Sequence, residues 1–239
     1  MLMRVVLVLF FLSLAANIGF ALADPHWLAI PALLLGWYVA DMLSGLVHMY
    51  MDYRPCAVGV GLDRIYFYEG SRESEEYQAM FRAAMTRINP LERLIYDFKN
   101  HHPRPNALGR RGVTRLIGST VVVGALPLSM ALNIVCLLLP SWGLTIPGWV
   151  VAGFSALLLG GAFAQYFHGT LHREHNVWIV RAMRRVGLLM TPRAHQLHHD
   201  TLKRDFSTNC GWSNPLLNAL FALAYRRRWL RDEGLEPVG

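Results

Sequence analysis

Four apolar segments of this chain are each long enough to cross a lipid bilayer, and they restrict the fold more than any other feature. A hydrocarbon core of ~30 Å is crossed by ~20 helical residues. Because 54% of the 239 residues are hydrophobic and only 16% are charged, the composition also differs from that of a soluble domain. We therefore predict an all-α integral membrane protein with four transmembrane helices. The expected spans are Val5 to Ala23, Leu28 to Val47, Leu116 to Leu139 and Ile146 to Phe167.

A fifth apolar run, Pro215 to Tyr225, is too short to span and is followed by three arginines and Trp229. A basic, aromatic end of this kind is typical of a helix at the membrane surface, so we predict an interfacial helix at about residues 215–225. The chain has no internal repeats and no long linker. We therefore expect residues 1–239 to form a single membrane-embedded domain.

The basic residues lie on one side of the predicted topology. Of the 23 Lys and Arg residues, eleven lie between spans two and three, eleven follow span four, and Arg4 precedes span one. The two opposite loops have none. The positive-inside rule then makes the basic face cytoplasmic. The net charge of +7 thus needs no nucleic acid partner.

The N-terminus has two interpretations. Arg4, the apolar run that follows it and the small residues Ala21 to Ala23 resemble a secretory signal peptide. We favour a retained span. Cleavage after Ala23 would leave the direction of span two unchanged, so the basic face stays cytoplasmic in both cases.

Nine of the ten histidines fall in two stretches that follow apolar spans, and only His26 lies apart. His168 and His172 are four residues apart, so they share a helix face. The same spacing recurs in the H-x-x-H-H sequence at 195–199, where Pro192 suits the first turn of a helix. Neutral imidazole is the commonest metal ligand in proteins. We therefore predict a cytoplasmic, histidine-rich helical cap that binds metal through His48, His101, His102, His168, His172, His195, His198 and His199.

Two aspartates and one further histidine are candidates for a supporting role. Asp41 is expected to be functional because a charged residue within a span is costly. Either Asp41 or Asp52 can accept the free N–H of a metal-bound His48. Direct ligation by Asp52 is the less favoured alternative. His175 is undecided, because it follows His172 by three residues but lies further from the membrane.

The number and type of ligands indicate which metal the site binds. Eight histidines suit two ions with open coordination positions better than one closed structural zinc site. We expect iron, because oxygen activation needs nitrogen-rich coordination with room for O2. Zinc hydrolysis is the chemical alternative, although no H-E-x-x-H sequence supplies a base. A metal or haem-binding membrane protein without enzymatic activity is the alternative of another class.

Five ordered sequence elements can be read from about Asp41 to Asn218: D-x-x-S-G-x-x-H-x-x-x-D (41–52), F-x-x-H-H-x-x-P-x-A-L (98–108), Q-x-x-H-x-x-x-H (165–172), P-R-x-H-x-x-H-H (192–199) and G-W-x-N (211–214). With these elements the chain resembles a known family, the lipid desaturase domain. This family includes plasmanylethanolamine desaturases and a plant plastid desaturase of phosphatidylglycerol acyl chains. The resemblance implies a membrane di-iron enzyme whose eight motif histidines hold two iron ions, with O2 as co-substrate.

Two features depart from the family pattern and bear on the substrate. The segment from Tyr53 to Leu91 is longer than the usual connection between the first two histidine motifs. Asn100 stands where plasmanyl desaturases tend to carry Glu.

We predict an O2-dependent desaturation of a membrane phospholipid. An ether phospholipid that becomes a vinyl ether (plasmalogen) ranks ahead of an acyl chain, and hydroxylation by the same site is a further alternative. Arg104 and Arg193 are candidates for binding the lipid head group. Because the chain has no flavin or dinucleotide fingerprint, electrons must come from an external donor that resembles cytochrome b5 or ferredoxin.

Overall fold

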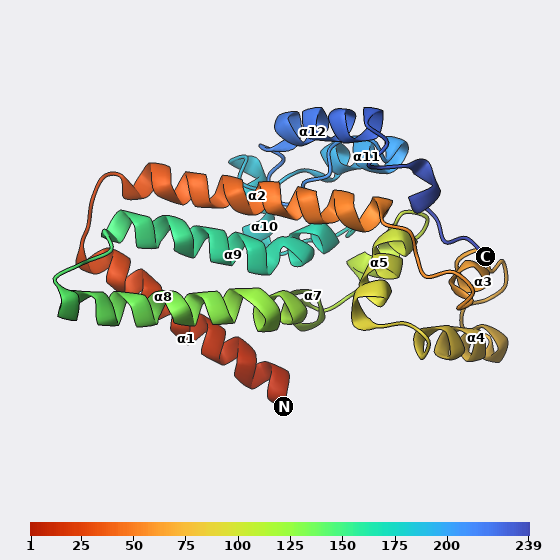
Figure 1. The fold of residues 1–239 in the computed structure, drawn as a ribbon, viewed down its shortest axis with the longest axis horizontal. Coiled ribbons are helices and arrows are strands. Elements are labelled where there is room, and N and C mark those ends of the chain that lie inside the picture. Colours follow the sequence, from red (N-terminus) through yellow and green to blue (C-terminus); the bar gives the residue numbers. More distant parts are fainter.

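The structure is a computed structural model that describes all residues 1–239, and every regular element in it is a helix (Figure 1). The elements of the long helical bundle are α1 (Leu2–Ala23), α2 (Ala29–Tyr53), α7 (Val113–Thr120), the π-helix η1 (Val121–Ala125), α8 (Leu126–Leu138), the 3-10 helix η2 (Leu139–Trp142) and α9 (Gly148–Leu171). The shorter elements are α3 (Leu62–Tyr66), α4 (Glu75–Met85), α5 (Pro90–His101), α6 (Pro105–Gly109), α10 (Trp178–Arg185), α11 (Pro192–Thr201), α12 (Asn214–Arg226) and η3 (Asp232–Gly234).

Four helical segments are long and apolar enough to cross a membrane, as predicted: α1, α2, the continuous run from Val113 to Trp142, and α9. Each of them extends past at least one predicted end, and two of these extensions carry histidines of the predicted metal site. The α2 helix continues from Val47 to Tyr53, and α9 continues from Phe167 to Leu171. These last turns carry His48, and also His168, at the ends of membrane-crossing helices. The predicted interfacial segment 215–225 is a helix, α12.

The α2 and α9 helices form the central pair of the bundle and lie side by side over their length (Figure 1). Small residues allow this close approach. A Cβ atom added to Gly36 would overlap the carbonyl oxygen of Gly153, and one added to Gly160 would lie 2.7 Å from the Cβ of Ala40. Backbone contact through small residues is typical of packed membrane helices. The closely packed pair supports His48 and His168, which lie near the C-terminal ends of the two helices.

The α1 helix is joined to α8 by polar side chains inside the bundle. The amide of Asn17 donates to the Ser129 hydroxyl at 2.8 Å, and the amide of Asn133 donates to the Ser13 hydroxyl at 2.8 Å. The side chain of Asn17 is fully buried. Hydrogen bonds of this kind hold membrane helices together. In this structure α1 is therefore an integral part of the bundle.

The long segment between α2 and α5 folds into a small helical unit with its own hydrophobic core. Ile65 and Tyr66 of α3 pack with Tyr77 of α4 against Ile95 and Tyr96 of α5. The α5 helix begins at a capping box. The Asn89 side chain accepts the backbone N–H of Glu92, and the Glu92 side chain accepts the backbone N–H of Asn89. Pro90 lies in the first turn of the helix. The segment therefore supports α5, the helix that ends at His101.

Candidate metal centre

The eight predicted histidines converge on one place at the end of the bundle. Helices α2, α5, α9 and α11, together with the residues directly after α5 and α9, bring them there from four distant parts of the sequence. They fall into two groups, and within each group one ligand atom from every residue lies within 4.8 Å of the others. The five-histidine group contains His101, His168, His172, His195 and His199, and the aspartate group contains His48, Asp52, His102 and His198.

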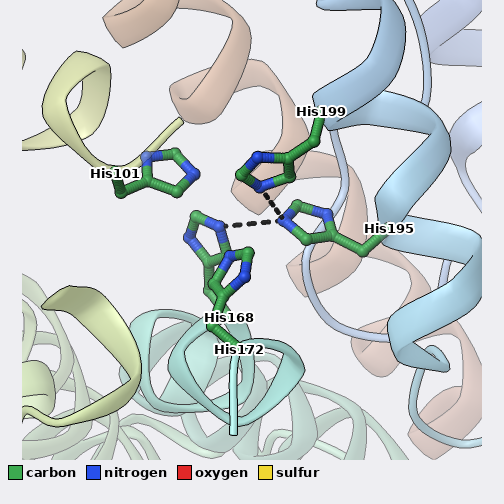
Figure 2. Close-up of side chains that lie close together, drawn as sticks. All are labelled: His101, His168, His172, His195 and His199. Carbon is green, nitrogen blue, oxygen red and sulfur yellow. Dashed lines mark hydrogen bonds between the residues drawn. The ribbon is translucent and has the colours of Figure 1, made fainter. Parts of the chain in front are cut away.

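In the five-histidine group, imidazoles from α5, α9 and α11 face one another (Figure 2). The Nε2 atom of His195 lies 3.1 Å from the Nε2 of His168 and 3.2 Å from that of His199. Two nitrogens bound to one ion at ~2.1 Å, at angles near 90–100°, would lie roughly 3.0–3.2 Å apart. The spacing therefore fits nitrogens that share a metal ion.

The aspartate group has a buried carboxylate at its centre. The oxygens of Asp52 lie 3.4 Å from His48 Nε2, 3.5 Å from His102 Nε2 and 3.3 Å from His198 Nε2. The carboxylate thus faces the same nitrogen atoms that can bind a metal. The carboxylate can therefore act as a ligand beside three imidazoles, which is the alternative that the sequence left open for Asp52.

Backbone carbonyls set the tautomers of three histidines. The Nδ1–H of His48 donates to the Phe206 carbonyl oxygen at 2.9 Å, and that of His198 donates to the Arg204 carbonyl oxygen at 2.9 Å. His101 makes the equivalent bond to Phe98. With the proton on Nδ1, the lone pair of Nε2 faces the group interior. The carbonyl of Phe206 therefore occupies the place next to His48 that the sequence gave to an aspartate.

Asp41 holds a loop instead. Its carboxylate accepts backbone N–H bonds from Cys210 at 2.8 Å, Gly211 at 3.0 Å and Ser213 at 3.0 Å. The hydroxyl of Ser44 accepts a further N–H from Thr208 at 3.1 Å. These bonds fix the loop between α11 and α12, which also provides the carbonyl next to His48. Asp41 therefore acts on the site through the loop backbone.

The loop explains why the G-W-x-N sequence accompanies the histidine motifs. Gly211 has a φ of +83°, a conformation that favours glycine. Asn214 accepts the backbone N–H of Ser207 at 3.0 Å, which closes the loop on itself. The first and last motifs of the sequence thus interlock across the site.

Several buried atoms that face the two groups have no hydrogen-bond partner in the protein. They are His48 Nε2, His101 Nε2, His172 Nε2 and both carboxylate oxygens of Asp52. Each unpaired buried polar atom costs roughly 1–3 kcal/mol. Metal ions bound between these atoms would satisfy them together. The donor set, mostly imidazole nitrogen with one carboxylate, suits iron or zinc.

Five histidines of the site that lie outside the spanning helices have lowered pKa values, which favour the neutral imidazole near pH 7. Burial, reinforced by the neighbouring imidazoles, lowers the pKa of His172 to about 3 and that of His199 to about 4. The same causes lower the pKa of His101, His102 and His195. Because a metal binds the neutral imidazole, these residues need not lose a proton to bind it near pH 7.

Lys99 supports the site and was not predicted from the sequence. Its side chain is fully buried, and its ammonium group donates to the carbonyl oxygens of Met51, at 3.1 Å, and Asp52. A cation at the C-terminus of a helix is favourable, because the last carbonyls there are unpaired. Burial lowers the pKa of Lys99 to about 8. Lys99 thus ties α5 to the turn of α2 that carries the carboxylate.

The remaining predicted residues lie outside the two groups. His175 is exposed. Arg104 donates to the Asn100 side chain at 2.9 Å and to the Tyr66 carbonyl at 2.7 Å, so its guanidinium is engaged within the protein. Arg193 is exposed on α11. His26 lies just before α2, at the opposite end of that helix from His48, and accepts the backbone N–H of Leu28 at 3.2 Å.

Comparison with known proteins agrees with the geometry of this site. The lipid desaturase domain matches residues 90–225, which include the histidines of α5, α9 and α11. The chain belongs to the lipid desaturase family. A plasmanylethanolamine desaturase of Myxococcus xanthus is 26% identical to it over 246 residues, covering 98% of this chain and 74% of the relative. No solved structure matches the chain. The lipid desaturase described here is thus an oxidoreductase and a multi-pass membrane protein, with histidine groups that can bind metal.

Proposed function

We propose that this protein is a di-iron, O2-dependent desaturase that converts a plasmanyl ether phospholipid to its vinyl ether. The observation that carries the proposal is the pair of donor groups at the end of the bundle. One offers five nitrogens, and the other offers three nitrogens and a carboxylate. The proposed lipid is the one named for the bacterial relative, a plasmanylethanolamine desaturase.

The number of donors favours two ions. Nine donor residues exceed the six positions of an octahedral ion, and they already fall into two sets with separate centres. In an octahedral shell the five-histidine group leaves one position open, and the aspartate group, with four donors, leaves two. An open position is what a metal needs in order to react as well as to bind. We therefore assign one iron to each group.

Bound iron would supply the oxidant, because the unactivated methylene group of a lipid chain has no proton acidic enough for a base to remove. The protein's own contribution is position and dryness. The spanning helices exclude water around His168. The carbonyl groups of Phe206 and Arg204 hold the imidazoles of His48 and His198 in one orientation. Two hydrogens leave neighbouring carbons, and O2 is reduced to water with electrons from outside the chain.

We place the histidine end on the cytoplasmic side, because nearly all basic residues accompany it. Electrons would reach it from a cytochrome b5-like or ferredoxin-like protein docking on this face. The chain itself offers no redox cofactor motif other than the histidine groups.

Metal content and lipid analysis test the proposal. Purified protein should contain about two irons per chain. Stoichiometric zinc without iron would contradict it. Expression in a host that contains plasmanyl lipids but no plasmalogens should produce vinyl ethers, detected by mass spectrometry of the lipids. A new acyl double bond or a hydroxyl group in the product would instead identify the alternative substrate or reaction.

A further inference from the structure

A small cavity reaches the five-histidine group from the side of the bundle. It lies between α5, α7 and α9, beside α6, and has a volume of about 60 Å³. His101 and His168 form part of its wall, so whatever occupies the cavity touches the proposed metal site directly. The other lining residues are Leu94, Asp97, Phe98, Leu108, Arg111, Arg115, Leu116, Ser119 and Gln165.

The wall of the cavity changes in character from inside to outside. Phe98, Leu108 and Leu116, near the histidines, are buried and apolar. Arg115 and Ser119, one turn apart on α7, are exposed. The α7 helix forms the first turns of the third spanning segment. The exposed end of the cavity therefore lies where a spanning helix leaves the hydrocarbon, which is the level of lipid head groups.

The charges at this exposed end favour an anion. Asp97 is paired with Arg111 at 3.1 Å, so these two side chains largely neutralise each other. The guanidinium of Arg115 makes no hydrogen bond or ion pair within the protein, and only its backbone N–H donates, to the Gly112 carbonyl at 3.1 Å, so its charge is uncompensated. A guanidinium group binds the oxygens of a phosphate in a forked arrangement.

The path from Arg115 to the histidines is short. The neighbour of Arg115, Leu116, packs on α9 next to His168, where a Cβ added to Gly169 would lie 3.1 Å from Leu116 Cδ1. A single water molecule needs roughly 10–15 Å³ of such a cavity, so a volume of about 60 Å³ has room for roughly four to six of them. The cavity thus has room for a few methylene groups between its mouth and the metal site, but not for a long stretch of lipid chain.

We propose that Arg115 binds the phosphate of the phospholipid substrate and that the cavity presents carbons close to the glycerol backbone to the five-histidine group. The proposal rests on the proposed desaturase function and specifies it. When the phosphate is bound at Arg115, a bond next to the ether oxygen is close enough to reach the histidines through the cavity. A bond in the middle of a lipid chain is too far from the phosphate. Arg115 is then a specificity-determining residue, and the test must separate binding of phosphate from the chemistry.

The decisive variant is Arg115→Gln, with Arg110→Gln as a matched control, because Arg110 is also exposed in the same region but does not line the cavity. Each purified, iron-loaded variant is given two substrates: an ether phospholipid and a 1-alkyl-2-acylglycerol, which lacks the phosphate. We expect Arg115→Gln to raise KM for the phospholipid about 10-fold and to leave kcat and the kinetics with the neutral lipid nearly unchanged. Arg115→Lys should restore part of the affinity, and Arg110→Gln should match the wild type.

Native mass spectrometry of phospholipid binding provides a readout that does not depend on turnover. Arg115→Gln should bind the phospholipid more weakly than the wild type does and the neutral lipid equally well. Unchanged phospholipid binding and KM in Arg115→Gln would overturn the proposal, and so would an equal loss with both lipids. A wild-type protein that forms no desaturated product from either lipid would contradict the proposed function, while the binding comparison would still test Arg115.

Discussion

The two donor groups differ in charge and in surroundings, although their centres are adjacent. The five-histidine group contains no carboxylate and borders the cavity through His101 and His168. The aspartate group includes the carboxylate of Asp52 and is held from behind by the loop that contains Phe206. An anionic oxygen ligand stabilises the more highly charged state of a metal more than an imidazole does. From this comparison we expect that two bound ions would be inequivalent and that the lipid would approach the one in the five-histidine group.

The groups also differ in what positions them. Helical spacing is sufficient for much of the five-histidine group, since its pairs on α9 and α11 are each four residues apart. In the aspartate group, the orientations of His48 and His198 depend on carbonyl groups of residues 206 and 204. A change in the loop should therefore disturb the second group more than the first.

The largest effect is expected when a ligand that borders the cavity is removed. His168→Ala should lower product formation at least about 100-fold, because even changes to residues that only support metal ligands cost 10–100-fold. Lipid product is measured by mass spectrometry in membranes with equal amounts of each protein. His175→Ala is the matched control, since His175 is exposed and belongs to neither group. Full activity of His168→Ala would contradict the assignment of the reaction to the five-histidine group.

A weaker but more specific effect is expected in the aspartate group. Asp52→Asn keeps the shape of the side chain but removes its charge, so the iron content should fall from about two per chain towards one. Activity should fall by about 10–100-fold. Asp200→Asn, on the exposed surface of α11, is the control. Unchanged iron content in Asp52→Asn, measured by elemental analysis, would show that Asp52 is not a ligand.

The sequence predicted the features that depend on local periodicity and missed those that depend on distant backbone. Apolar run length was sufficient for the four spanning helices, and i,i+4 spacing was sufficient for the pairs on α9 and α11. The carbonyl of Phe206 could not be anticipated, because a main-chain acceptor has no signature in the residue type. The same holds for Lys99, whose partners are the carbonyl groups of residues 47 and 48 positions earlier. The assignment of Asp41 to the metal surroundings was incomplete for this reason, since its partners are the N–H groups of a loop about 170 residues away.

An intermediate effect should follow from Gly45→Ala, which tests the dependence of the aspartate group on the loop. A Cβ at Gly45 would overlap the Leu217 side chain and lie 3.0 Å from the backbone nitrogen of Ser207. Overpacking of this kind costs about 1–3 kcal/mol. Because Ser207 follows Phe206, the carbonyl next to His48 should move, and iron should dissociate from one group about 10-fold faster.

The control for this change is Gly161→Ala in α9, where an added Cβ meets no atom within 4 Å. Release of iron to a chelator, followed over time, measures the difference between the variants. Two release phases in Gly45→Ala, one fast and one with the rate of the wild type, would assign the fast phase to the aspartate group. Equal acceleration of both phases would contradict the separate support of the two groups.

The smallest effect concerns the pH dependence of the five-histidine group. The pKa values of His172 and His199 in the folded protein, about 3 and about 4, lie below the usual value of 6.5 that they regain on unfolding. Between these values the unfolded chain binds more protons, so the free energy of unfolding rises with pH. The metal-free protein should therefore melt at a lower temperature as the pH falls below about 6.5. Below its folded pKa, each histidine should no longer change the free energy of unfolding with pH. Replacing His172 with Gln removes one titrating group, so the melting temperature should decrease less between pH 7 and pH 5. The control is His175→Ala, which changes an exposed histidine and should show the same decrease in melting temperature as the wild type. An identical decrease in the wild type and His172→Gln would show that burial of this group does not determine the acid sensitivity.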